Sequence, residues 1–221
     1  MVSEKSSKKE EKKEKVNLEA GKVFTKEFIK TIVLITGLII FIRFFVIQPF
    51  IVKGGSMEPN FHDNNYIFVN ELSYRFTDPK RGDVVIFKHP EKECTEFVNK
   101  SFINRIFLQG PCTNFIKRVI GLPGETVVIK DGKVIIKNTG NPDGFTLSES
   151  YIPASDNFKL RGNISKTLGK DEYFVLGDNR QPNASLDSRE WGALPENHIT
   201  GKALIRVLPF NDFGFIRHPK Y

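Results

Sequence analysis

The chain has 221 residues, with 33 Lys and Arg against 26 Asp and Glu, and a formal net charge of +7. Its length fits one domain of ordinary size and a short additional segment, and a body of about 170 residues can bury a substantial core. The basic residues are scattered and form no recognition motif, so a nucleic-acid partner is not expected. With only 2 Cys, the chain is not a disulfide-framework mini-protein.

Residues 1–26 are predicted to form a disordered, charged tail. Residues 1–22 hold seven Lys and five Glu and almost no apolar side chains. Such a segment cannot bury enough apolar surface to offset the entropy that ordering would cost.

Residues 27–48 are predicted to form one transmembrane helix. The stretch Phe28–Ile47 is apolar except for Lys30 and Arg43 near its two ends, where long basic side chains can reach the interface. Twenty helical residues span roughly 30 Å, the thickness of a hydrocarbon core, and Pro49 cannot continue the helix. A cleavable signal peptide is disfavoured because no small-residue cleavage site follows. A buried core helix is disfavoured because the stretch is apolar on every face.

The distribution of Lys predicts the orientation of this helix. Residues 8–27 carry seven Lys, whereas residues 48–67 carry only Lys53. Basic residues near membrane helices stay in the cytoplasm. We therefore expect a single-pass protein of the cytoplasmic membrane in contact with its lipid, with residues 1–26 in the cytoplasm and residues 49–221 outside.

Residues 49–221 are predicted to be mainly β. Apolar residues recur with period two, β-branched and aromatic residues are common, and no βαβ rhythm is present. The pattern predicts strands at Phe50–Val52, Tyr66–Val69, Val84–Phe87, Phe115–Ile120, Thr126–Ile129, Val134–Lys137, Tyr173–Leu176 and Ala203–Leu208.

Two regions of this body are predicted to be additions. Residues 90–113 form an insertion in which Val98, Phe102 and Ile106 have helical spacing, and this indicates a short helix. Residues 138–170 are rich in Gly, Asn, Ser and Asp. They are expected to be the loop-rich part of a small accessory lobe over about residues 124–172.

The two cysteines, Cys94 and Cys112, both lie in the insertion. Outside the cytoplasm a disulfide between them is plausible, and two unpaired thiols are the alternative. No His or further Cys has ligand spacing around them, so no metal or cofactor is expected.

Three short stretches carry the chemistry of the chain. The first is Gly-Gly-Ser-Met-Glu-Pro at residues 54–59, the second is Lys-Arg-Val-Ile-Gly-Leu-Pro-Gly at residues 117–124, and the third contains Gly-Asp-Asn-Arg and Ser-Leu-Asp-Ser-Arg within residues 177–189. In this order, behind one apolar span, they resemble the bacterial type I signal peptidases over roughly residues 43–210. The resemblance implies a coiled antiparallel β catalytic body and a monomeric, membrane-bound serine endopeptidase. Such an enzyme uses a Ser/Lys dyad to cleave signal peptides from exported preproteins.

Lys117 also has, by itself, the surroundings that a lysine base requires. A serine hydroxyl is a poor nucleophile until a base takes its proton, and a lysine can do so only if burial lowers its pKa from about 10.4. In a strand, Phe115 and Val119 share the face of Lys117. The alternative is an ordinary surface lysine on an exposed strand face. A Ser-His-Asp triad has no support, because no His lies in the three stretches.

The resemblance assigns roles residue by residue. Ser56 corresponds to the nucleophile, Lys117 to the general base and Ser185 to the serine that hydrogen-bonds and orients the lysine. A supporting charged network corresponds to Arg118, Asp178, Asp187 and Arg189. The residues that align with the walls of the substrate pocket, which takes small side chains such as alanine, are Val52, Met57, Phe61, Ile67, Ile86, Phe115 and Ile116.

Gly54 departs from the family pattern, in which many members have a serine whose hydroxyl helps to bind the oxyanion. The Ser56 N–H remains as one donor. This predicts that Gly54→Ser does not harm kcat and can raise it. The alternative is that the backbone at this position needs positive φ, which requires glycine.

Three other functions are compatible with parts of the sequence. The alternatives are a specialised relative with one dedicated substrate, a non-catalytic membrane-anchored β binding domain, and a self-cleaving repressor-type Ser/Lys protein. Retention of Ser56, Lys117 and Ser185 disfavours the binding domain, and the repressor type would need a DNA-binding domain and no anchor.

Overall fold

The computed structural model describes residues 24–39, 47–99, 110–153, 160, 163–219 and 221. The chain divides into two compact units, Met1–Val46 and Ile47–Tyr221.

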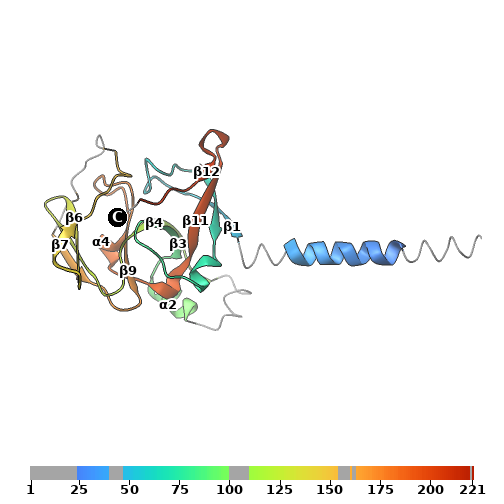
Figure 1. Cartoon of the computed structure of the whole chain (residues 1–221), viewed down its shortest axis with the longest axis horizontal. Coiled ribbons are helices and arrows are strands. Elements are labelled where there is room, and N and C mark those ends of the chain that lie inside the picture. Colours follow the sequence, from blue (N-terminus) through green and yellow to red (C-terminus); the bar gives the residue numbers. More distant parts are fainter. Residues whose placement is uncertain (1–23, 40–46, 100–109, 154–159, 161–162, 220) are drawn as a thin grey trace, which may run out of the picture. The chain divides into compact units, whose positions relative to one another are not determined.

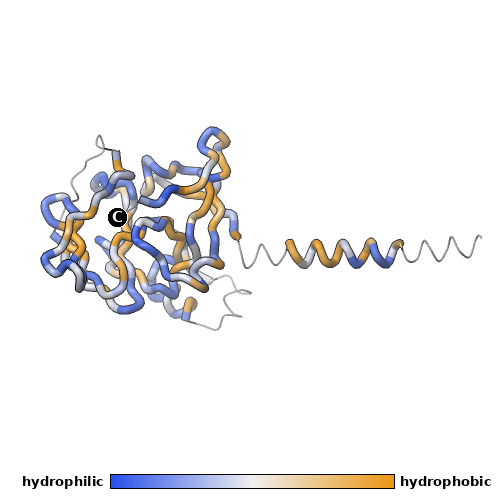
Figure 2. Tube along the Cα trace, viewed as in Figure 1, coloured by the Kyte–Doolittle hydropathy of each residue, from blue (hydrophilic) through white to orange (hydrophobic). Residues whose placement is uncertain are grey.

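In the first unit, residues 24–39 form a helix (Figure 1). Many of its residues are hydrophobic, as the orange turns in Figure 2 show. The predicted span over residues 27–48 falls partly on residues 40–46, which lie outside the described part. Its last two residues were predicted wrongly, because Ile47 and Gln48 begin a strand and pair with Asn70 and Val69. Within the described residues, none of the helices combines the length and the hydropathy that crossing a membrane requires.

The second unit is mainly β, as the period-two pattern predicted, and all its strand pairs are antiparallel. Its described strands are β1 (Ile47–Ile51), β2 (Tyr66–Asn70), β3 (Val84–Lys88), β4 (Asn114–Gly121), β5 (Thr126–Lys130), β6 (Lys133–Asn138), β7 (Asn141–Thr146), β8 (Ile164–Thr167), β9 (Glu172–Leu176), β10 (Leu194–Pro195), β11 (Ile199–Leu208) and β12 (Gly214–Phe215). Short helices are α2 (Lys92–Val98), α4 (Ser188–Trp191), η1 (Ser73–Arg75), η3 (Glu196–His198) and η4 (Phe210–Asp212).

The strands form two sheets (Figure 1). The larger sheet has eight strands in the order β1-β2-β11-β3-β4-β9-β10, with β12 paired to β11. The smaller sheet has four strands in the order β7-β6-β5-β8. Strand β4 pairs with β3 on one side and with β9 on the other, so both of its edges are bonded.

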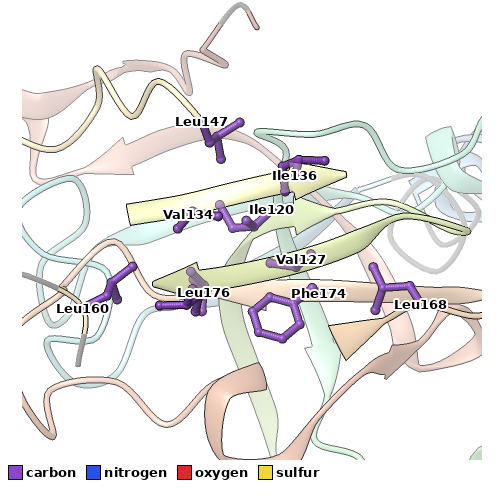
Figure 3. Packing of buried hydrophobic residues seen from close by; sticks show 10 residues of the cluster. Ile120, Val127, Val134, Ile136, Leu147, Leu160, Leu168, Phe174 and Leu176 are labelled. Carbon is purple, nitrogen blue, oxygen red and sulfur yellow. The ribbon is translucent and has the colours of Figure 1, made fainter. Parts of the chain in front are cut away.

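Buried side chains gather in three clusters, and β4 contributes to all of them. Ile116 belongs to a cluster with residues of β2 and β3, and Val119 belongs to a second cluster with residues of β3 and β9. Ile120 belongs to a third cluster between β4, β9 and the smaller sheet (Figure 3). A strand that packs against apolar residues on both faces has apolar residues at successive positions. Val119 and Ile120, which follow Lys117 and Arg118 on β4, show this pattern. A charged residue on β4 is therefore surrounded by core.

All eight predicted strands are present, although β1 and β11 begin several residues earlier than predicted. The prediction that residues 138–170 are mostly loop was wrong in part, because this stretch contains β7 and β8. Strand β7 has the sequence NPDGFT, in which Pro, Asp and Gly are typical of turns. Pairing with β6 overrides that local preference. The predicted helix in the insertion exists as α2 and includes Val98, whereas Phe102 and Ile106 lie outside the described residues.

Candidate active site

Ser56 and Lys117 meet although 61 positions separate them. Ser56 lies in the turn that follows β1, and Lys117 lies on β4. The Ser56 Oγ and Lys117 Nζ atoms are 2.6 Å apart, which is hydrogen-bonding distance. Lys117 Nζ also donates to the Ile116 carbonyl oxygen at 2.9 Å. The two side chains are thus placed for direct proton transfer.

Lys117 is buried, with 4% of its surface exposed. Burial lowers its pKa from the ordinary value to about 8, while Asp187 and Asp178 oppose this shift and Arg189 adds to it. The Phe115 ring centroid lies 5.4 Å from Lys117 Nζ. Burial is the dominant cause because the charged form loses its hydration. At neutral pH, roughly one-tenth of Lys117 is uncharged.

Asp187 organises the third sequence stretch. Its carboxylate is fully buried and accepts hydrogen bonds from Arg189 Nε at 2.7 Å and from the Gly177 N–H at 3.1 Å. It is also the N-cap of α4, accepting from the Arg189 N–H. Asp187 and Arg189, two members of the predicted charged network, therefore form an ion pair.

Ser185 was predicted to hydrogen-bond Lys117, and the structure gives it another partner. The Ser185 hydroxyl donates to Asp187 at 2.8 Å. Among the described residues, the hydrogen bonds of Lys117 Nζ go to Ser56 and Ile116. The single hydroxyl proton of Ser185 thus goes to a charged acceptor, with which it forms a stronger hydrogen bond than with a neutral one. No direct hydrogen bond between Ser185 and Lys117 is present in this conformation, and the role of Ser185 in orienting the lysine stays a prediction.

Arg118 and Asp178 form a second buried pair. Arg118 Nε and Nη2 donate to the two carboxylate oxygens of Asp178 at 2.8 and 2.5 Å. The Arg118 guanidinium also lies 4.1 Å from the ring centroid of Tyr151, and Asn60 Nδ2 donates to Asp178 at 2.9 Å. Both predicted charges therefore join one network, and Tyr151 and Asn60 are members that the sequence analysis missed.

A further ion pair also escaped the sequence analysis. Arg180, in the Gly-Asp-Asn-Arg stretch, is 4% exposed and pairs with Glu149 at 2.5 Å. Tyr151 OH donates to Glu149 at 2.7 Å. Glu149 and Tyr151 lie in a stretch for which no chemistry was predicted. In the sequence alone, Arg180 of the third motif stretch was the only indication that an acidic partner was required.

Most of the predicted pocket residues are buried, whereas Phe115 is partly exposed. Six of them belong to one buried cluster, namely Val52, Met57, Phe61, Ile67, Ile86 and Ile116. Met57 and Ile86 are 0% exposed, so they cannot contact a substrate in this conformation. In this conformation they form a buried apolar cluster, and their role as walls of the substrate pocket stays a prediction. Phe115 packs against a different cluster, with Phe87 and Val119.

Gly54 has a φ of +79°, and an added Cβ would meet no atom within 4 Å. Its N–H donates to Asp63 at 2.8 Å. The left-handed backbone, rather than crowding, is what favours glycine here. The structure therefore supports the backbone alternative over the prediction that Gly54→Ser is harmless.

The interactions of His89, His198 and the two cysteines do not involve Ser56. Within the described residues, Ser56 has no histidine partner: His89 stacks on Phe115 with ring centroids 4.6 Å apart, and His198 lies beside the Lys88 carbonyl. Cys94 on α2 forms a disulfide with Cys112, which lies two positions before the start of β4.

The arrangement can support attack by an activated serine on a carbonyl carbon. It supplies a hydroxyl, a buried amine in contact with it, and a backbone N–H at the nucleophile. In the described residues no group of three or more His, Cys, Asp or Glu could hold a metal ion.

Comparison with known proteins adds independent findings. The family model described as signal peptidase, peptidase S26, matches residues 25–208. A signal peptidase I from Leptolyngbya laminosa is 38% identical over 87% of this chain and 84% of its own. A probable signal peptidase I-2 from Synechocystis is 34% identical over 98% of this chain and 84% of its own. A signal peptidase I from Bacillus licheniformis is 31% identical over 84% of this chain and 90% of its own.

Proposed function

This chain belongs to the signal peptidase family, peptidase S26, and we propose that Ser56 and Lys117 carry out its reaction. It is a serine peptidase that cleaves signal peptides from preproteins, as its relatives named signal peptidase I do. The observation that best supports the assignment is the 2.6 Å separation of Ser56 Oγ and Lys117 Nζ.

In the first half of the reaction, neutral Lys117 Nζ takes the proton of the Ser56 hydroxyl as Oγ adds to the scissile carbonyl carbon. The carbonyl electron pair moves onto its oxygen, to which the Ser56 N–H donates. When the tetrahedral intermediate collapses, the Lys117 ammonium gives its proton to the departing amine. The signal peptide is then held as an ester on Ser56.

In the second half, water replaces the amine. Lys117, neutral again, takes a proton from water as the water oxygen adds to the ester carbon. Collapse returns the proton to Ser56 Oγ and releases the carboxyl end of the signal peptide. The charged pairs Asp187–Arg189 and Asp178–Arg118 hold β4 and the third stretch in register and are expected to act on the dyad through position and field rather than by contact with substrate.

The test is cleavage of a preprotein by purified enzyme in detergent, followed by amino-terminal sequencing of the product. Ser56→Ala and Lys117→Ala should each abolish cleavage and leave the fold intact, because nucleophile and base act as a unit. Lys117→Arg should also be inactive, since a guanidinium does not deprotonate.

Matched controls are Ser165→Ala and Lys170→Ala, which change exposed residues of the smaller sheet region. Both controls should cleave normally. Normal cleavage by Ser56→Ala would remove the dyad from the mechanism.

We also propose that residues 27–46 anchor the enzyme in the cytoplasmic membrane, with residues 47–221 outside the cytoplasm. The support is the apolar character of this stretch and the excess of Lys on its amino-terminal side. A site outside the cytoplasm is where a translocated preprotein presents its cleavage point.

A further inference from the structure

The turn that carries Ser56 is held from outside by Asn179. The Asn179 N–H donates to the Ser56 carbonyl oxygen at 3.1 Å. The Asn179 side-chain amide donates to the Gly55 carbonyl oxygen at 2.9 Å. One residue therefore bonds two successive carbonyls, on either side of the nucleophile's Cα.

The orientation of the Asn179 side chain is fixed as well. Its Oδ1 accepts the Gln181 N–H at 3.1 Å, so Nδ2 must face Gly55. Gly177, two positions before Asn179, also lies close to the turn, since a Cβ at this position would lie 2.2 Å from Ser185 Oγ and 2.4 Å from the Ser56 carbonyl oxygen. These two contacts explain why position 177 is glycine, and the absence of a side chain there lets the 177–179 segment lie against the Ser56 turn.

The hydrogen bond to the Gly55 carbonyl also determines the direction of the Ser56 N–H. The Gly55 carbonyl and the Ser56 N–H belong to one peptide unit, which is planar and trans, so they point in opposite directions. In the described residues the cis bonds are Glu58-Pro59 and Leu208-Pro209. A donor that fixes the Gly55 carbonyl thus fixes the direction of the Ser56 N–H, which itself has no acceptor among the described residues.

We propose that Asn179 is a positioning residue that aims the Ser56 N–H at the oxyanion of the tetrahedral intermediate. This inference rests on the proposed role of Ser56 as nucleophile. Because Gly54 has no side chain, the Ser56 N–H is the donor on which the site depends, and its direction matters more than in relatives with a second hydroxyl. Asn179 does not contact the reacting atoms and acts through the peptide plane.

Two substitutions separate this role from a general structural one. Asn179→Ala removes the bond to Gly55 and keeps the backbone bond to Ser56. Asn179→Asp keeps an acceptor for the Gln181 N–H, and so keeps that turn, but it places an acceptor opposite the Gly55 carbonyl. Both should lower kcat, by about tenfold for Ala and by more for Asp, with KM changed less than twofold; complete loss of an oxyanion donor costs roughly 10²–10³.

The second readout is binding of a peptide aldehyde that ends in alanine. Ser56 Oγ adds to the aldehyde carbon, its proton goes to Lys117, and the aldehyde oxygen becomes an oxyanion in the same position. A transition-state mimic follows kcat/KM rather than KM. Its dissociation constant should therefore rise by the factor by which kcat/KM falls. The pH limb of kcat/KM should not move, since Lys117 is untouched.

Asn197→Ala is the matched control, because Asn197 is an exposed asparagine that donates to Asn99 at 2.8 Å. It should leave both readouts unchanged. Ser56→Ala in the same assay tests the nucleophile separately: if it stays active, the proposed dyad fails, whatever Asn179 does. If Ser56→Ala is inactive while folded Asn179→Ala and Asn179→Asp keep kcat and aldehyde affinity, or raise KM alone, the role of Asn179 is overturned.

Discussion

Lys117 lies on a strand bonded at both edges and is 4% exposed, yet its proposed role is to exchange protons. Burial, Asp187, Asp178 and Arg189 act on its pKa with different signs, and burial prevails, lowering the pKa to about 8. The apolar neighbours Phe115 and Val119 could be predicted from period two. The two carboxylates near the lysine do not follow from this periodicity: the resemblance assigned Asp178 and Asp187 to the charged network, and their distance from Lys117 depends on how β4 and β9 pair.

We predict that activity rises with pH along one limb set by Lys117. Only the neutral amine can accept the Ser56 proton, and with a pKa of about 8 roughly one-tenth of it is neutral at pH 7. The kcat/KM for a peptide substrate should therefore increase about tenfold between pH 7 and a plateau above about pH 9. Melting temperatures across the same range control for unfolding. A limb near the free value of about 10.4 would contradict a buried base.

We predict that Gly54→Ser and Gly54→Ala both lower stability and activity. A residue with a Cβ at φ +79° is strained by about 1–2 kcal/mol, and relaxation would move the turn that carries Ser56. Gly214→Ala is the control, because a Cβ there also meets nothing within 4 Å and its φ is not positive. Melting temperature and kcat distinguish the two explanations. Unchanged stability with higher kcat in Gly54→Ser alone would instead support the prediction that a hydroxyl at position 54 supplies a second oxyanion donor.

At the scale of elements, the stretch after β7 links the smaller sheet to the site. Glu149 in this stretch pairs with Arg180 of the third motif stretch, and Tyr151 contacts Arg118 of the second. Local sequence could not reveal this link, because a Glu and a Tyr in a Ser-rich stretch are ordinary surface residues. The strands with strong β-branched patterns, such as β5 and β6, were predictable. Strand β7 was not, because its sequence is typical of a turn although it pairs with the neighbouring β6, and β8 was not, because its partner β5 is distant in sequence.

We predict that Glu149→Ala destabilises the second unit by about 3–5 kcal/mol, because it leaves the Arg180 charge buried without its partner. Glu149→Gln should cost less, since it keeps a hydrogen-bond acceptor. Asp171→Ala is the matched control, because it breaks an exposed ion pair. In this pair the Lys170 side chain is 91% exposed and the Asp171 side chain 66%. Exposed pairs contribute about 0–1 kcal/mol to stability. Denaturant unfolding measures all three, and equal effects of Glu149→Ala and Asp171→Ala would show that the buried pair has no special importance.

At the scale of the whole molecule, the three motif stretches come from three parts of the sheet. The turn after β1, strand β4 and the segment after β9 converge because β4 pairs with β9 and the 177–179 segment crosses the turn. Ser56 and Lys117 were found by resemblance, since no local pattern links residues 61 positions apart. The two hydrogen bonds from Asn179 to the Ser56 turn were not predicted, because a motif identifies residue types and not the carbonyl groups to which they bond.

We predict that the amino-terminal tail stays in the cytoplasm while the second unit lies outside. The tail side of the apolar stretch has seven Lys within residues 8–27, and the other side has only Lys53 within residues 48–67, so the tail should be retained. The Cys94–Cys112 disulfide leaves no free cysteine, so single introduced thiols can report topology. In intact spheroplasts, a membrane-impermeant maleimide should label Lys170→Cys, whose lysine side chain is 91% exposed. It should label Ser3→Cys only after lysis, and the unsubstituted protein should stay unlabelled throughout. Labelling of Ser3→Cys without lysis, with Lys170→Cys protected, would reverse the orientation, and labelling of both would rule out a single span.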